Sequence, residues 1–283
     1  MRNSTIEIIP LAANCGAKIL GIDLNSASDA DLDVVRETVY AHGVVTLPDQ
    51  NLTPASQVRL AERFGTPEPH KIAKGLDEFP VITRVHKAAG DAATFGVGWH
   101  SDNSFQETPT SISMLAARKI PPVGGDTLYA NQYLAYEELS GGMKSMLGQM
   151  TAVHSAKYAF TVPTAVERYG NEDATISYEM NDIVYAEVEH PVVRTHPETG
   201  VKALYVNPMF TIRFKDMTEA ESQPLLTYLY AQATRPELQC RVQWSDDAVT
   251  LWDNRCVQHY AMDDYRQYER VLDRITIKGD RPV

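Results

Sequence analysis

The chain contains one segment with the residue types of a metal site, Trp99-His100-Ser101-Asp102-Asn103-Ser104-Phe105. Its core is a His-x-Asp pair, in which one residue separates two side chains able to bind a metal. On a β-strand, residues two positions apart point to the same face, so a strand here would direct His100 and Asp102 toward one ion. The pair alone is a weak signal, because a surface aspartate beside a hydrogen-bonded histidine gives the same pattern.

A third ligand has to come from a distant part of the chain, and His259 is the candidate. It lies in the segment Trp252-Asp253-Asn254-Arg255-Cys256-Val257-Gln258-His259-Tyr260. Two imidazoles and one carboxylate on one face of an ion leave the opposite positions open, and that is the ligand set of non-haem Fe(II) oxygenases. Cys256 is close to His259 in sequence, but a small buried core residue explains it better than a ligand does.

Two arginines follow this segment, Arg270 and Arg274. If the region is a strand, residues 270, 272 and 274 share a face, and two guanidinium groups then point the same way. Burying both costs desolvation unless anions meet them. The alternative is that both lie on the surface, paired with Asp273 or Glu269, where such pairs contribute little.

Segments carrying these residues resemble the taurine dioxygenase/2,4-dichlorophenoxyacetate dioxygenase (TauD/TfdA-like) family of Fe(II)- and 2-oxoglutarate-dependent dioxygenases. The resemblance extends from about residue 7 to the C-terminus and keeps the family's order. The matching segments are Trp99 to Phe105, Gly124-Gly-Asp-Thr-Leu128, Leu204-Tyr-Val-Asn207, Trp252-Asp-Asn254, His259-Tyr260 and the Arg270/Arg274 pair.

The resemblance implies a role for each site residue. Fe(II) would be bound by His100, Asp102 and His259. The cosubstrate 2-oxoglutarate would be held through its C5 carboxylate by Thr127 and Arg270. Contacts to the substrate are implied for three residues, with Arg274 gripping its anionic group: His70, Asn103 and Arg274. No catalytic residue beyond the metal centre is implied.

The implied reaction uses O2 to oxidise a C–H bond and releases succinate and CO2. Hydroxylation can be followed by cleavage of a carbon–heteroatom bond or by desaturation. Halogenation is disfavoured, because related halogenases have a small residue where this chain has Asp102. Taurine is also disfavoured, because Ala73 and Gly96 stand where the taurine enzyme has Tyr and Asn near its substrate.

The substrate expected from the resemblance is a small organic anion. Between Val192 and Thr250 the chain is more similar to aryloxyalkanoate dioxygenases, in segments such as His196-Pro197 and Met217 to Ser222. That similarity favours a carboxylate-bearing substrate. A sulfonate or an alkyl sulfate is the alternative.

Composition limits the remaining functions. The net charge is −11, from 26 basic and 37 acidic residues, and no basic cluster suggests nucleic-acid binding. No apolar run is long enough for a membrane span, and the N-terminus lacks the apolar region of a signal peptide. The three cysteines have no metal-like spacing, so we expect reduced thiols and a cytoplasmic protein. The resemblance implies a homo-oligomer, a dimer or a tetramer.

The pattern of elements predicts one mostly β domain over residues 1–283. Short strands alternate with helices that begin at Ser28, Thr53 and Thr218, which indicates a double-stranded β-helix, a cupin-like jelly roll with flanking helices. Val242 to Trp244 and Ala248 to Trp252 are predicted to form a hairpin. Segments near residues 86–98 and 157–183 are predicted to be lids.

Two other functional classes fit part of the pattern. A Zn or Mn hydrolase on a cupin-like barrel would use His100, Asp102 and His259 but would give Arg270 no role. A jelly-roll binding protein without catalytic activity would leave the three residues without a common purpose. Release of succinate from 2-oxoglutarate distinguishes the dioxygenase from the hydrolase. The binding protein predicts no affinity for Fe(II) and no gain in stability from Fe(II) plus 2-oxoglutarate.

Overall fold

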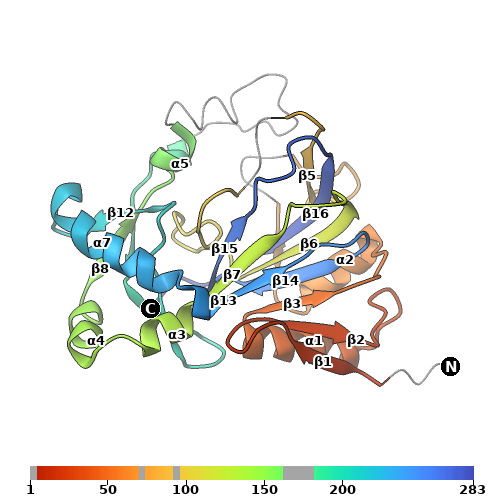
Figure 1. The fold of residues 1–283 in the computed structure, drawn as a ribbon, viewed down its shortest axis with the longest axis horizontal. Helices are drawn as coiled ribbons and strands as arrows, with labels where there is room; N and C mark the ends of the chain where they lie inside the picture. Colours follow the sequence, from red (N-terminus) through yellow and green to blue (C-terminus); the bar gives the residue numbers. More distant parts are fainter. Residues whose placement is uncertain (1–4, 70–73, 92–95, 162–181) are drawn as a thin grey trace.

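A computed structural model describes residues 5–69, 74–91, 96–161 and 182–283. In these ranges a large sheet and a smaller one pack against each other, and helices cover the outside (Figure 1). The predicted mostly β fold with flanking helices is confirmed, and the two facing sheets form the double-stranded β-helix. Among the helices of the described ranges, none combines the length and apolar composition needed to span a bilayer.

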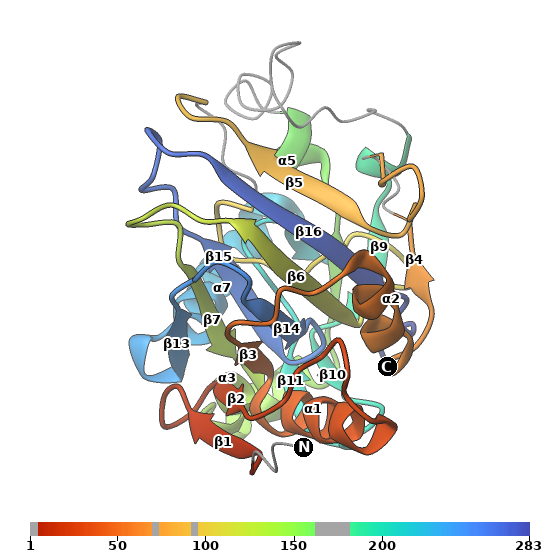
Figure 2. The same cartoon turned by 90° about the vertical axis from the view of Figure 1, so that its right-hand side faces the viewer.

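The larger sheet has eight strands and provides one wall of the interior. Most of its pairs are antiparallel, and β2 and β3 are parallel. Seven strands follow the order β1 (Glu7–Pro10), β2 (Ala17–Leu20), β3 (Val44–Leu47), β14 (Val249–Asp253), β6 (Ile112–Lys119), β16 (Arg270–Ile277) and β4 (Pro67–Glu68). The eighth strand, β5 (Thr83–Lys87), also pairs with β16. The long strands β6 and β16 lie side by side in Figure 2.

The opposite wall is a three-stranded sheet in the order β13 (Gln239–Val242), β7 (Thr127–Asn131) and β15 (Val257–Ala261). The rings of Tyr129 on β7 and Trp252 on β14 are 5.6 Å apart between centroids, so the two walls meet in one apolar interior. The described residues form two further small sheets: β12 (Thr211–Phe214), β8 (Thr151–His154) and β9 (Val188–Pro191), and β10 (Val193–Thr195) with β11 (Lys202–Leu204).

The helices begin where the sequence places capping residues. Ser28 accepts a hydrogen bond from the backbone N–H of Asp31, and the Asp31 carboxylate accepts from the N–H of Ser28, which is a capping box. Thr218 and Glu221 do the same for a later helix. Within the described ranges the helices are α1 (Asp29–His42), α2 (Pro54–Glu62), α3 (Gln132–Glu137), α4 (Gly141–Leu147), α5 (Lys157–Thr161) and α7 (Glu219–Ala233), with 3-10 turns at Asp182–Val184 and Pro236–Leu238.

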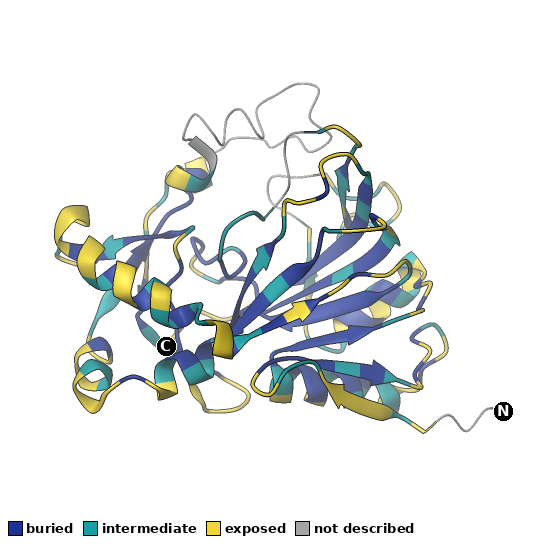
Figure 3. Ribbon diagram, viewed as in Figure 1, coloured by how far each residue is buried: buried dark blue, intermediate teal, exposed yellow. Residues whose placement is uncertain are grey.

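Gly43 ends α1 in a conformation that favours glycine, with φ +76°. Its N–H donates to the carbonyl of Val39, and a Cβ here would lie 2.7 Å from Cγ1 of Val257. The chain can therefore turn directly from α1 into β3. Helices α1 and α2 then pack on the outer face of the large sheet over a continuous apolar core, and the buried residues of both walls appear in dark blue in Figure 3.

The predicted hairpin between residues 242 and 252 is wrong. β13 pairs with β7, whereas β14 pairs with β3 and β6. The two strands therefore belong to opposite walls, and residues 243–248 cross between them. Local sequence gives the strands and the turn, but the partner of each strand is set by distant segments.

A break separates α3 from α4. It falls before Gly141, because Ser140 caps α4 by accepting from the N–H of Met143, and Gly141 is the first residue of the helix. The predicted lid segments include residues 92–95 and 162–181, which lie outside the described ranges, so the lids stay predictions.

Candidate active site

His100 and His259 meet in an isolated antiparallel bridge between the two segments that the sequence singled out. Each backbone N–H donates to the other residue's carbonyl, at 3.1 Å and 2.8 Å. The bridge brings the two imidazole centroids within 4.1 Å of each other. Trp252 covers the His259 ring at a centroid distance of 4.8 Å, so one side of the pair is closed to solvent.

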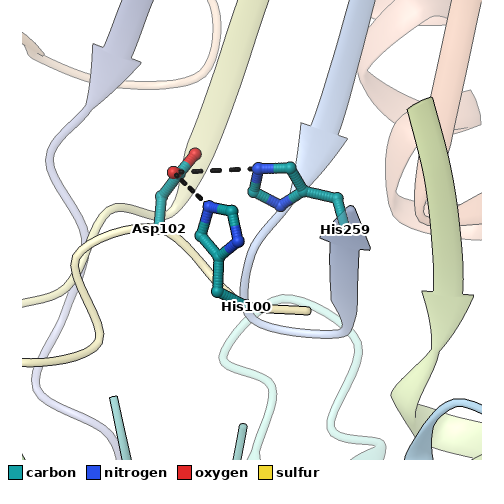
Figure 4. Close-up of side chains that lie close together, drawn as sticks. All are labelled: His100, Asp102 and His259. Atoms are coloured by element: carbon teal, nitrogen blue, oxygen red, sulfur yellow. Dashed lines mark ion pairs between the residues drawn. The ribbon is translucent and has the colours of Figure 1, made fainter. Parts of the chain in front are cut away.

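Asp102 completes a buried cluster with these histidines (Figure 4). Its Oδ1 lies 3.6 Å from Nε2 of His100 and 3.9 Å from Nε2 of His259. Two donors bound to one ion through bonds of about 2.1 Å lie at most about 4.2 Å apart, so both distances suit a shared ion. The donor set, two imidazole nitrogens and a carboxylate, therefore fits the predicted iron site.

One expectation about this cluster is wrong. His100 and Asp102 do not lie on a regular strand, because His100 forms only the single bridge to His259 and the chain turns at Asp102. The turn continues through Asn103, which has φ +55°. The turn and the bridge bring Nε2 of His100 and Oδ1 of Asp102 together. The two residues are the predicted pair, but the alternation of side chains along a strand is not what makes them converge.

The protonation states suit metal binding. Burial lowers the pKa of His259 well below its usual value, and His100 and the cationic Arg274 lower it further. Burial opposes the charge of Asp102, but the nearby Arg274 and the two histidines outweigh it, and the pKa of Asp102 lies well below its usual value. The Nδ1 atom of His100 is 2.8 Å from the carbonyl oxygen of Gly98, so Nδ1 carries the proton and donates it. The Nε2 atom of His100 therefore has a free lone pair that can bind a metal.

A cavity extends from this cluster toward the first residues of β7 and β16. Five of the predicted site residues line it: Asp102, Thr127, His259, Arg270 and Arg274. Most of this cavity's polar residues are therefore ones that the sequence singled out, although they come from four distant segments. Its apolar wall includes Val85, Leu115 and Leu272.

Arg270 and Thr127 form one end of the cavity. The Arg270 guanidinium is buried beside the Trp244 and Tyr265 rings, at 5.4 Å and 5.7 Å from their centroids, and its Nε and Nη2 atoms have no hydrogen-bond partner among the described residues. Thr127 Oγ1 accepts from the Trp244 indole N–H at 3.0 Å, which leaves the hydroxyl proton for another acceptor. A buried cation and a hydroxyl donor suit a carboxylate.

Arg274 lies nearer the cluster, with Nη2 2.8 Å from Oδ1 of Asp102. The surface alternative for the two arginines is wrong, because both are buried. Asp273 lies on the opposite face of β16 and pairs with Arg84 and Arg118. Glu269, at the start of the strand, pairs with Lys119 and His86. The strand alternation thus directs the buried Asp273 away from the cavity and both arginines into it.

The other two residues predicted to contact the substrate, Asn103 and His70, are not among the described residues that line this cavity. The Asn103 side chain donates to Oγ1 of Thr110 at 2.9 Å and does not line this cavity. His70 lies outside the described residues, as does Ala73. Gly96 does line the cavity, and a Cβ at this position would be 3.4 Å from Cε1 of His100.

A second cluster of metal-binding residue types, His196, Asp253 and Cys256, is structural. Arg255 makes a bidentate pair with Asp253, and Nε2 of His196 donates to the same carboxylate at 2.9 Å. Nδ1 of His196 already accepts two backbone N–H groups. These atoms have no free lone pair aimed at a common point, so the expectation that Cys256 is a core residue agrees with its burial.

Sequence reasoning missed three side chains at the site: Ser113, Asn254 and Trp244. Asn254 belongs to the Trp-Asp-Asn motif but had received no role. A serine inside the apolar run Ile112-Ser113-Met114 was a usable signal, because a polar side chain in a buried strand needs a partner. Nothing local marks Trp244 as the partner of Thr127.

A double-stranded β-helix that carries two histidines, one carboxylate and a buried arginine defines the class of non-haem iron, 2-oxoglutarate-dependent dioxygenases. The family model described as "Taurine catabolism dioxygenase TauD, TfdA family" matches residues 7–276. The chain belongs to this family and is an enzyme of that class, with Fe(II), 2-oxoglutarate and O2 as its cofactor and cosubstrates.

Individual relatives agree with this assignment. The chain is 34% identical to an alkylsulfatase of Acinetobacter baylyi, over 97% of this chain and 86% of the relative. It is 32% identical to an alpha-ketoglutarate-dependent sulfate ester dioxygenase of Pseudomonas putida, over 98% and 91%. The crystal structure of a taurine dioxygenase from Burkholderia xenovorans superposes with a TM-score of 0.82 at 31% identity, covering 99% of this chain and 91% of that one.

Proposed function

We propose that His100, Asp102 and His259 bind Fe(II), and that the cavity beside them binds 2-oxoglutarate and a small organic anion. The observation that carries the proposal is the convergence of three buried donor atoms within 4.8 Å of one another beside a cavity lined by two arginines. When bound, the iron and 2-oxoglutarate supply the oxidation of a substrate C–H bond with release of succinate and CO2.

Arg270 and Thr127 hold the far carboxylate of 2-oxoglutarate in this proposal. The guanidinium has two donors without partners among the described residues, and the neighbouring hydroxyl has a proton to donate. Trp244 and Tyr265 pack beside the guanidinium and keep water away. A hydrolase would leave this buried cation without a counter-ion, which is the reason to prefer the dioxygenase for this site.

Arg274 orients the substrate by its anionic group. Two of the relatives are named for sulfate esters, so a sulfate ester is the first substrate class to test. A carboxylate is the second candidate, favoured by the resemblance of residues 192–250 to aryloxyalkanoate dioxygenases. Asn103 and His70 remain proposed substrate contacts that the described cavity does not include.

The proposal extends to the domain organisation, the cellular location and the oligomeric state of the protein. The whole chain, residues 1–283, works as one domain in the cytoplasm, where the three cysteines stay reduced. Cys15, Cys240 and Cys256 are free and buried, which agrees with that setting. A homo-oligomer, a dimer or a tetramer, is proposed from the resemblance to the family.

The test is a substrate panel with Fe(II), 2-oxoglutarate and air, measured by succinate release. It contains alkyl sulfates, aryloxyacetates, aryloxypropionates, taurine and amino or hydroxy acids. Stimulation by alkyl sulfates or by carboxylates identifies the anion that Arg274 recognises. Substrate hydrolysis without succinate, with metal bound, would instead establish the metallohydrolase. The matched pair is His259→Ala, which removes a proposed ligand, and His42→Ala, which removes a histidine outside the cavity.

A further inference from the structure

The Asp102 carboxylate is held from behind by a chain of buried side chains. Oγ of Ser113 lies 2.6 Å from Oδ2 of Asp102, and Nδ2 of Asn254 lies 2.9 Å from Oγ of Ser113. Ser113 is on β6, directly opposite Trp252 of β14 in the register of the large sheet. All three linked side chains are buried, so water does not compete for these hydrogen bonds.

The direction of every hydrogen bond in this chain is determined by its donors. The backbone N–H of Asp102 and the indole N–H of Trp252 each lie 3.0 Å from Oδ1 of Asn254. Both groups can only donate, so the amide oxygen of Asn254 faces them and its NH2 faces Ser113. Ser113 therefore accepts from Asn254 and donates its single hydroxyl proton to Asp102.

This arrangement gives the two oxygens of Asp102 different surroundings. Oδ2 receives the proton of Ser113, whereas Oδ1 faces both histidine Nε2 atoms and Arg274. The hydroxyl also prevents the carboxylate from turning about its own axis, because any rotation would leave Oδ2 buried without a donor.

We propose that Ser113 and Asn254 are positioning residues that restrict Asp102 to binding the metal through Oδ1 alone. The inference rests on the metal site proposed above. A carboxylate bound through both oxygens would occupy an additional position on the ion. Restricting it to one oxygen keeps open the positions that 2-oxoglutarate and O2 require in this class.

The test measures metal binding by the full-length protein without any turnover. Co(II) is titrated into metal-free protein under anaerobic conditions, and the Kd and the visible spectrum of the bound ion are recorded. Ser113→Ala should raise the Kd about tenfold, as loss of a residue that orients a ligand usually does. Its Co(II) spectrum should shift, because Asp102 can then bind through both oxygens.

Ser111→Ala is the matched control. Ser111 precedes β6, and its buried hydroxyl bonds to the carbonyls of Ile277 and Lys278 instead of to Asp102. The same atom is removed, so a similar fall in Tm is expected with an unchanged Co(II) Kd and spectrum. Ser113→Thr keeps the hydroxyl and should bind Co(II) within about threefold of the wild type. If Ser113→Ala does not fold, Ser113→Cys supplies the comparison, because a thiol is a weak donor.

The Co(II) titrations distinguish failure of the positioning role from failure of the proposed metal site. Wild-type Kd and spectrum in Ser113→Ala, or in Ser113→Cys if that variant is used, would overturn the positioning role. Failure of the wild type to bind one Co(II), or equal binding by His259→Ala, would instead overturn the metal site on which the inference rests.

Discussion

Arg274 and Asp102 form a buried ion pair in which Nη2 lies 2.8 Å from Oδ1, the oxygen that also faces both histidines. The same oxygen is thus shared by a fixed cation and by the proposed metal. The charge of Arg274 makes the pocket attractive to an anion but opposes a divalent cation at the cluster. Asp102 therefore couples the proposed binding of the metal to the proposed binding of the substrate anion by Arg274.

Removing this charge should separate the two effects. We expect Arg274→Ala to raise the substrate KM at least about tenfold, because the anion loses its charged hydrogen-bond donors. The same variant should bind Co(II) several-fold more tightly, since a cation close to the metal has been removed. Titration with Co(II) and steady-state kinetics measure the two effects, and weaker Co(II) binding would show that Arg274 supports the cluster instead of opposing it.

Arg270 should affect the cosubstrate selectively. Arg270→Lys keeps the charge but loses the planar fork, so the KM for 2-oxoglutarate should rise about 10- to 100-fold with little change in the substrate KM. Arg274→Lys is the paired variant and should show the reverse pattern. Identical profiles for the two variants would contradict the separate roles.

Gly96 should be sensitive to a single added carbon. It has φ +79°, and its Cβ would lie 3.4 Å from Cε1 and 3.9 Å from Nε2 of His100. Gly96→Ala is therefore expected to lower kcat/KM by crowding the cavity. The matched control is Gly90→Ala, since Gly90 has φ +90° with nothing within 4 Å. Both variants carry similar backbone strain of about 1–2 kcal/mol, so an equal loss of activity in both would refute the crowding.

Buried histidines away from the cavity should make the fold sensitive to acid. Burial lowers the pKa of His190 from 6.5 to about 4, and the pKa of His154, whose ring centroid is 5.2 Å away, is also lowered by burial. The unfolded chain binds these protons first, so stability should fall as the pH drops from about 6.5 toward 4. The contribution of His190 to the free energy of unfolding is at most about 3.4 kcal/mol.

Thermal unfolding from pH 7.5 to 4.5 measures this effect. His190→Gln removes one titrating group and should show a smaller decrease in Tm over this range than the wild type. A parallel decrease in the two proteins would assign the acid sensitivity to other groups.

Much of the fold and of the site could be predicted from local sequence. The capping boxes at Ser28 and Thr218 placed helix starts correctly, because a cap depends on residues only three positions apart. Period-two spacing correctly put Arg270 and Arg274 on one face of a strand. The family order of the motifs indicated the cofactor chemistry, which the family match confirms.

Other features were decided by the tertiary structure. The separation of β13 and β14 into opposite walls, the His100–His259 bridge and the contact between Ser113 and Asp102 all join distant segments. The sequence by itself determined which residue types were available and how neighbouring residues alternate along each strand. Only the folded chain decided which strand pairs with which, because register and pairing depend on the burial of whole faces in a common core and not on any local pattern.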